Sequence, residues 1–261
     1  MATTTKKDAA PKRGKRRGGP DGRGSGSWTA EFRGYFAESR SLALSVVLVS
    51  PLLLLYELAL VYYPPAQPTG ARSFVGDVMF AIFRSRALTA LHVLAVAAFL
   101  VAAFVLLRRR TMRLNLVAPM VLESSGWAAV LVGIAVVIFR RLAHTRLEVG
   151  DAAPAAALKV IGSLGAGIYE ELLFRLVLAG LLYFIGIKLF EGDKRRAGAL
   201  AVVVSAAVFA LCHTMAPPVY IHLLFYFTAG LVFGTLYLCR GLGVAIYTHT
   251  IYDIVVLLAG T

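Results

Sequence analysis

Two adjacent glutamates, Glu170 and Glu171, lie in the middle of a long apolar stretch and are followed four residues later by Arg175. Ionisable side chains are costly in hydrocarbon, so such a cluster indicates a functional site. Residues four apart share a helix face, which predicts that Arg175 pairs with Glu171. An ion pair that joins helices would explain these two residues. It leaves Glu170 without a cation of its own, and a carboxylate of this kind can act as a general base.

Two further polar groups occur in equally apolar surroundings. His213 ends an apolar segment shortly before Pro217 and Pro218, where a lone histidine can also be a polar cap of a helix. His249 and Asp253 are four residues apart, so they share a helix face and can hydrogen-bond, which would orient the imidazole. Each group alone has a structural explanation. Together they place acids and bases on three apolar segments, and hydrolysis by a carboxylate base and two imidazoles explains them jointly.

Membrane helices must position these residues. The chain has 261 residues, of which 59% are hydrophobic, and its mean hydropathy is +0.75. This composition predicts an all-α polytopic membrane protein, a bundle of about seven to eight transmembrane helices with an intramembrane polar cavity. The stretch 155–187 is too long for one perpendicular span and must tilt or break, and residues 71–85 are predicted to lie on the membrane surface. The apolar spans are 41–63, 87–107, 114–139, 155–187, 198–215, 219–239 and 242–259.

The charge is unevenly distributed along the chain. Of the net charge of +13, much falls in residues 1–40, which carry ten Lys and Arg against four acids. This segment is predicted to be a disordered basic tail that lies in the cytoplasm against anionic lipid headgroups of the cell (inner or plasma) membrane. Nucleic-acid binding is not expected, because charge alone would support it. Residues 41–150 are predicted to form N-terminal transmembrane helices, and residues 151–261 a catalytic helical core.

Isolated polar residues in the N-terminal half are predicted to hydrogen-bond neighbouring helices. They are Glu57, His92 and Glu123. Glycines that precede His249 are expected to allow close approach of helix backbones or to shape a cavity. They are Gly230, Gly234, Gly241 and Gly243.

The ordered motifs Glu-Glu-x-x-x-Arg, Phe-x-x-x-His and His-x-x-x-Asp resemble those of the CPBP intramembrane proteases, which include the Rce1-type CAAX prenyl endopeptidases and the abortive-infection proteins. The resemblance covers roughly residues 155–259. It implies an enzyme of about eight helices that hydrolyses a peptide bond near the membrane face. In that family pattern Glu170 activates water, and Glu171 and Arg175 orient it. The centre is completed by His213, His249 and Asp253.

The resemblance is compatible with a metal-dependent mechanism and with a metal-free glutamate mechanism. An ionised Asp253 would repel an oxyanion, so it is better suited to be a partner of His249 or a ligand. Glu170, His213 and His249 would supply the nitrogen and oxygen ligands that suit zinc. The substrate implied is a membrane-anchored or hydrophobic peptide or protein. Its end could be prenylated, or it could be a peptide or C-terminal sorting segment.

Two other classes of protein remain open from the sequence. A multi-pass transporter could use embedded Glu, His and Asp side chains as a proton relay, although the chain shows no paired halves. A non-catalytic membrane scaffold could keep the same residues for structure. A Glu170→Gln variant separates the three, because a protease loses cleavage while it folds normally, a relay loses transport, and a scaffold keeps its partner.

Overall fold

The computed structural model describes residues 26–62, 85–108, 114–142, 156–213 and 219–259. The chain divides into two compact units, one that ends at Gly34 and one that runs from Tyr35 to Thr261. The second unit contains the site residues and is the one described below. Residues 71–85, for which a surface location is predicted, lie outside the described residues except for Ser85.

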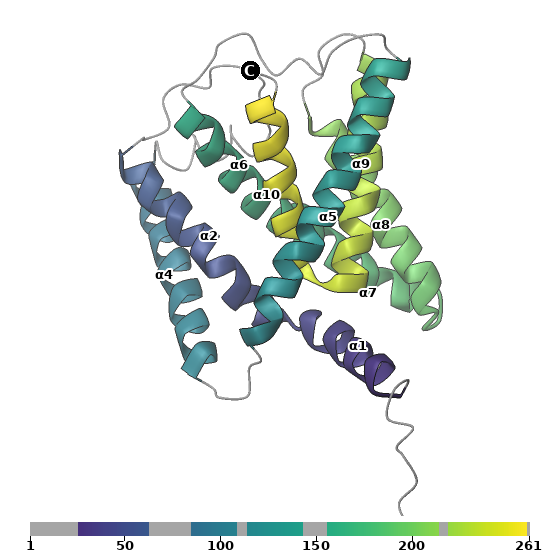
Figure 1. Ribbon diagram of the computed structural model, residues 1–261, viewed down its shortest axis with the longest axis horizontal. Coiled ribbons are helices and arrows are strands. Elements are labelled where there is room, and N and C mark those ends of the chain that lie inside the picture. The colour runs from purple at the N-terminus through teal and green to yellow at the C-terminus, as the bar shows by residue number, and fades with distance from the viewer. Residues whose placement is uncertain (1–25, 63–84, 109–113, 143–155, 214–218, 260–261) are drawn as a thin grey trace, which may run out of the picture. The chain divides into compact units, whose positions relative to one another are not determined.

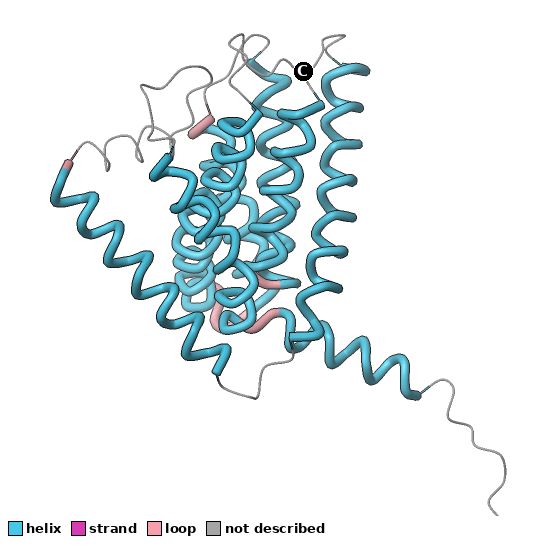
Figure 2. Tube along the Cα trace, turned by 60° about the vertical axis from the view of Figure 1, so that its left-hand side comes forward, coloured by secondary structure: helices cyan, strands magenta, loops and turns pink. Residues whose placement is uncertain are grey.

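The described elements are all helical, which confirms the predicted all-α class (Figure 2). Regular helices alternate with two π-helical segments, η2 and η3, and one short 3₁₀ segment, η1. In chain order the elements are α1 (Gly26–Ser39), α2 (Leu42–Tyr62), α4 (Arg86–Arg108), η1 (Leu114–Leu116), α5 (Val117–Val136), η2 (Val137–Leu142), α6 (Ala156–Glu171), η3 (Leu172–Ala179), α7 (Gly180–Leu189), α8 (Lys194–Leu211), α9 (Val219–Arg240) and α10 (Leu242–Ala259).

Within the described residues, four helical segments are long and apolar enough to cross a membrane, so the chain is a multi-pass membrane protein. They are Leu42–Tyr62, Leu114–Arg140, Val160–Leu189 and Val219–Arg240. Two shorter apolar helices, His92–Arg108 and Leu242–Leu258, match two further predicted spans. The span predicted at 198–215 corresponds to α8, which begins with Lys194, Arg195 and Arg196 and is therefore less apolar than the others.

The prediction of disorder through residue 40 is wrong for residues 26–39, which form α1. The aromatic residues Trp28, Phe32, Tyr35 and Phe36 recur at the spacing of one helix face, and this pattern favours an amphipathic helix despite the glycines nearby. The remainder of the predicted tail, residues 1–25, lies outside the described residues.

The long stretch that begins near residue 155 stays helical through to Leu189 rather than breaking. Its middle segment, η3, has the wide turn of a π-helix. At its end the N–H of Gly180 donates to the carbonyl oxygen of Arg175, five residues earlier. Single π-helical turns occur frequently at functional sites, and this one begins directly after Glu171 and contains Arg175.

Helix α10 is central to the packing of the second unit and contacts α6, α5, α9 and α2. Figure 1 shows it between α6 and α5. Small residues set these close approaches. A Cβ on Gly167 of α6 would lie 2.9 Å from the backbone nitrogen of Thr250 in α10, and a Cβ on Gly243 would lie 3.2 Å from the Cα of Ser45 in α2. The glycines therefore let the site-bearing helices pack backbone to backbone.

Three of the four predicted glycines lie at close contacts between helices, and the fourth makes a turn. A Cβ on Gly230 in α9 would lie 2.8 Å from the Cα of Ala206 in α8, and one on Gly234 would lie 3.3 Å from Val202. Gly243 meets α2 as described above. Gly241 has φ of +93° and makes the turn between α9 and α10, a conformation that favours glycine.

Hydrogen bonds between helices account for the isolated polar residues of the N-terminal half, as predicted. His92 Nε2 lies 3.0 Å from Glu57 Oε1, and the hydroxyl of Tyr169 donates to the same oxygen at 2.8 Å. These contacts join α2, α4 and α6. Arg240 in α9 donates from Nε and Nη2 to the two oxygens of Glu123 in α5, at 2.5 and 2.6 Å.

Candidate active site

The carboxylate of Glu171 joins α6 and α10, two of the helices that carry the site. Its Oε1 lies 3.0 Å from Nη1 of Arg175 and 2.8 Å from Nδ1 of His249. Glu171 and Arg175 are fully buried, and His249 is 5% exposed. The i, i+4 pairing predicted for Glu171 and Arg175 is therefore confirmed. The bond to His249 crosses from α6 to α10 and could not be predicted from spacing along one helix.

Glu170 points away from this pair and towards the two histidines. Its Oε2 lies 3.5 Å from Nε2 of His213 and 3.8 Å from Nε2 of His249. The side chain is 97% buried. Both distances exceed the usual range of about 2.7–3.2 Å for a hydrogen bond to nitrogen. One water molecule beside these three atoms could hydrogen-bond to each of them, so the arrangement suits a carboxylate that activates water.

The Nδ1 atoms of both histidines are engaged by oxygen acceptors. His213 Nδ1 lies 2.7 Å from the carbonyl oxygen of Phe209, which can only accept, so Nδ1 carries the hydrogen. His249 Nδ1 faces Glu171 in the same way. Each Nε2 is therefore the atom turned towards Glu170. His213 combines the two readings of the sequence, because it caps a carbonyl at the end of α8 and also faces the site.

Asp253 has a different partner geometry from the one predicted. The spacing predicted that Asp253 orients the His249 imidazole by a hydrogen bond. That bond is made by Glu171 instead, while Asp253 Oδ2 lies 3.5 Å from the opposite nitrogen, Nε2. The reason is the close crossing of α6 and α10 at Gly167, which brings Glu171 to Nδ1. Asp253 shares Nε2 with Glu170, and its side chain is 22% exposed, the most exposed of the site residues.

Aromatic rings enclose the charged groups. Phe233 stacks on His249 with a centroid distance of 4.5 Å, and Tyr226 stacks on His213 at 4.2 Å. The Arg175 guanidinium carbon lies 4.4 Å from the centroid of the Phe209 ring and 5.1 Å from that of Phe233. These contacts stabilise a fully buried cation. Sequence reasoning missed Tyr226 and Phe233, because an aromatic residue in an apolar helix carries no signal of its own.

The donor types at the site fit a divalent metal, but a ligand set is not preformed. The Nε2 atoms of both histidines face Glu170, and each Nδ1 is bonded to oxygen, as is usual for histidines that bind a metal. Across the described ranges, no group of three or more His, Cys, Asp or Glu side chains is arranged to hold a metal ion. Glu170, His213 and His249 would therefore have to adjust their side chains to bind zinc together.

The comparison with protein families agrees with the motifs. Residues 152–255 match the family model of Rce1-like type II CAAX prenyl endopeptidases. This segment is a domain of that family, which contains proteases of the CPBP group. It begins beside the predicted start of the catalytic core at residue 151 and includes all six candidate site residues. Neither the search of curated proteins nor that of solved structures finds a match.

Proposed function

We propose that this protein is an intramembrane endopeptidase that hydrolyses a peptide bond near the membrane face. The proposal rests above all on Glu170, a buried carboxylate in the candidate span Val160–Leu189, whose Oε2 lies 3.5 and 3.8 Å from the Nε2 atoms of His213 and His249. The family of residues 152–255 supports peptide hydrolysis as the reaction. The buried cluster supports water as the nucleophile, because Glu170 and the Nε2 atoms of both histidines converge at distances that leave room for one water molecule.

In the proposed reaction Glu170 accepts a proton from a water molecule, and the water oxygen attacks the carbonyl carbon of the scissile bond. The carbonyl oxygen becomes an oxyanion, which an imidazole protonated on Nε2 can stabilise by donating a hydrogen bond. The tetrahedral intermediate then collapses, the carbon–nitrogen bond breaks, and Glu170 returns the proton to the leaving amine. The products are a carboxylate and an amine.

The other residues are proposed to position the reacting groups. Arg175 holds Glu171, and Glu171 holds His249 through Nδ1, so the ring presents Nε2 to Glu170. Asp253 lies against the same Nε2 and can balance the charge of a protonated imidazole. His213 is held by the Phe209 carbonyl and by stacking on Tyr226.

A divalent metal such as zinc, held by Glu170, His213 and His249, remains the alternative way to activate the water. When bound, it would polarise a water or the substrate carbonyl. Treatment of the purified protein with a chelator tests this. A metal-dependent enzyme should lose cleavage and recover it with added zinc, and metal analysis should find about one equivalent in the wild type and less in His213→Ala. Full activity in chelator would leave the metal-free reaction.

The substrate is proposed to be a membrane-anchored or hydrophobic peptide or protein. Its end could be prenylated, or it could be a C-terminal sorting segment. We also propose that the N-terminus faces the cytoplasm of a cell (inner or plasma) membrane, where basic residues of the tail meet anionic headgroups. Membrane-impermeant labelling of a cysteine introduced before residue 25 tests this orientation.

A comparison of membrane peptidomes tests the proposed reaction. Cells that express the wild type should contain cleavage products that are missing with Glu170→Gln, at equal protein levels. Glu123→Gln is the matched control, because it changes a carboxylate in a membrane helix away from the site, and it should keep the products. Products that persist with Glu170→Gln would falsify the role of Glu170. Loss of ion-coupled transport without any change in peptides would favour the proton-relay alternative, and a retained partner with unchanged peptides the scaffold.

A further inference from the structure

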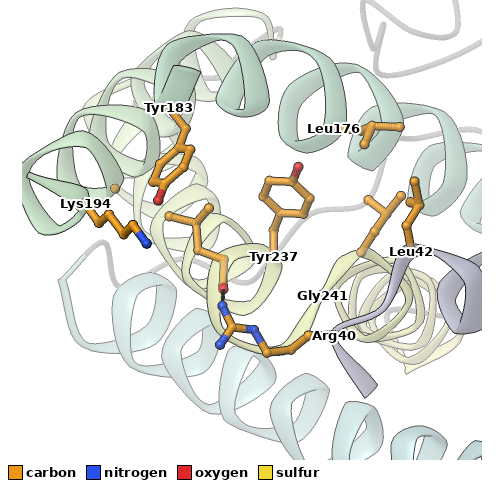
Figure 3. Close-up of a pocket in the computed structure, with 10 residues that line it drawn as sticks. Arg40, Leu42, Leu176, Tyr183, Lys194, Tyr237 and Gly241 are labelled. Atoms are coloured by element: carbon orange, nitrogen blue, oxygen red, sulfur yellow. Dashed lines mark hydrogen bonds between the residues drawn. The ribbon is translucent and has the colours of Figure 1, made fainter. Parts of the chain in front are cut away.

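A cavity of about 560 Å³ lies apart from the candidate active site, where several helices begin or end. Its lining comes from the start of α2, from η3 and α7, from the start of α8, and from the junction of α9 with α10. None of the six candidate site residues lines it. Figure 3 shows the side chains around it, with Tyr183 and Lys194 on one side and Arg40 on another.

The polar part of the cavity is positively charged. Arg40 and Lys194 come from distant parts of the chain, and both side chains are exposed. Arg40 Nη2 donates to the carbonyl oxygen of Leu238 at 2.8 Å, a neutral acceptor that fixes the guanidinium without cancelling its charge. Asp193, which precedes Lys194, is engaged elsewhere, since it accepts from the backbone N–H groups of Arg195 and Arg196 and pairs with the Arg196 side chain.

Hydroxyl groups and an apolar wall complete the lining. Tyr183 and Tyr237 are half-buried and bring phenol oxygens to the cavity. Leu42, Leu176 and Leu242 form the apolar wall. A phosphate group could bind to the two cations and accept hydrogen bonds from the phenols. A small inorganic anion would make no contact with the leucines, whereas the acyl chains of a lipid would. A cavity that is cationic at one part and apolar at another fits an amphiphile with an anionic head.

The position of the cavity along the helices agrees with such a ligand. The candidate span α2 starts at Leu42, the candidate span α9 ends at Arg240, and α10 starts at Leu242. Helix ends of this kind mark the interface between hydrocarbon and water. A ligand in the cavity would therefore hold its head at the level of lipid headgroups and its chains beside the apolar helix surfaces.

We propose that this cavity binds the headgroup of an anionic phospholipid, with its phosphate between Arg40 and Lys194 and the start of its acyl chains against Leu42, Leu176 and Leu242. The site does not depend on the proposed peptidase reaction. Bound lipid would connect the starts of α2 and α8 with the α9–α10 junction.

Native mass spectrometry of the full chain released from detergent tests the proposal. The probes are phosphatidylglycerol, phosphatidylcholine and glycerol phosphate, which separate an anionic lipid from a neutral lipid and from the headgroup alone. The wild type should retain phosphatidylglycerol in preference to the other two. The double variant Arg40→Gln/Lys194→Gln should lower its affinity about tenfold or more, because two charge-assisted contacts are lost. Gly198→Leu, which fills the cavity without a change of charge, should also weaken binding.

The matched control is Lys188→Gln/Arg195→Gln, which removes two exposed cations from the neighbouring helices α7 and α8 without touching the cavity. It should keep the wild-type affinity. An equal loss in the control would mean that surface charge attracts the lipid and would overturn the site. Unchanged binding in the Arg40/Lys194 double variant, or glycerol phosphate bound as tightly as the lipid, would overturn it as well. Melting temperatures of all variants without lipid show whether each one is folded.

Discussion

The carboxylates of the helices are held in two ways. Glu57, which joins α2, α4 and α6, receives contacts from His92 and Tyr169 at 3.0 and 2.8 Å. Glu123, which joins α5 and α9, receives two bonds from Arg240 at 2.5 and 2.6 Å. These are short contacts that join one helix to another, and a partly buried carboxylate bonded in this way stabilises the packing.

At the candidate active site, the two adjacent glutamates are held differently from each other. Glu171 is bonded like the carboxylates described above, to Arg175 and His249 at 3.0 and 2.8 Å. Glu170 faces His213 and His249 at 3.5 and 3.8 Å, beyond ordinary hydrogen-bond length. The difference teaches that burial of an acid alone does not mark a reactive site. What marks Glu170 is a set of convergent basic atoms that still has room for a reactant.

The largest expected effect is that variants of Glu170 and Glu123 change different properties, the first the cleavage rate and the second the stability. Glu170→Gln should lower the cleavage rate by about 10²–10⁴-fold, the usual contribution of a general base, with little change in stability. Glu123→Gln should lower the free energy of unfolding by about 1.5–3 kcal/mol, because the buried Arg240 loses its charged acceptor, and should leave cleavage near the wild-type rate. Rates on a product-derived peptide and unfolding in detergent measure both. Equal effects of the two variants on activity would erase the distinction.

The second largest effect is expected from breaking the ion pair of Glu171 and Arg175. Arg175→Met removes the cation beside Glu171 and should destabilise the protein by about 3–5 kcal/mol, because a carboxylate stays buried without its partner. The double variant Glu171→Gln/Arg175→Met should recover part of this loss. Denaturant unfolding of the two single variants and the double variant gives the coupling free energy. A coupling near zero would contradict the pairing of these side chains.

A larger side chain between α6 and α10 should be harmful at Gly167 and tolerated at Gly162. Gly167→Leu should cost about 1–3 kcal/mol and reduce cleavage, because the added side chain pushes against the backbone of Thr250 and moves Glu170 from His249. Gly162→Leu on the same helix is the control, since a Cβ there meets nothing within 4 Å. Comparable unfolding curves for the two variants would show that the close approach is not required.

The smallest expected effect is a pH dependence of stability that comes from Tyr35, which is hydrogen-bonded to Glu123. Burial, helped by the hydrogen bond to Glu123, raises the pKa of Tyr35 from 10.0 to about 12. Between these values the unfolded chain has lost the phenol proton while the folded chain keeps it, so stability falls as the pH rises. The contribution is complete below about pH 10 and disappears as the pH passes about 12. Tyr35→Phe should therefore show a smaller loss of stability than the wild type between about pH 10 and 12, as measured by thermal unfolding. Identical slopes would rule this linkage out.

How much of the site could be predicted depends on whether a contact lies within one helix. The pair of Glu171 and Arg175 follows from i, i+4 spacing. The cap that His213 makes on the Phe209 carbonyl follows from its place at a helix end. The bond from Glu171 to His249 does not follow, since it depends on how closely α6 crosses α10. The family motifs predicted that Glu171 and His249 belong to one site. They did not predict that Glu171 contacts Nδ1 of His249 while Asp253 lies near Nε2.

The fold shows the same limit. Long apolar runs specify α2, α9 and the segment Leu114–Arg140 that contains α5 almost to the residue, because about 20 apolar residues have few other stable states in a membrane. Helix α1 was missed because its amphipathic face is short and is flanked by glycines and basic residues. The stretch from Ala156 to Leu189 was expected to tilt or break, yet its wide turn at η3 depends on packing that the sequence pattern does not encode.

That wide turn affects which deletions the protein can absorb. A π-helical turn holds an extra residue compared with a regular one. Removing one residue from Leu172–Ala179 would therefore restore a regular turn there, and the helix on either side would keep nearly the same faces turned to its partners. Removing one residue from the regular helix α7 allows no such adjustment, because everything before the deletion would rotate by about 100°. Glu170 and the α7 surface that packs on α8 could then no longer both face their partners.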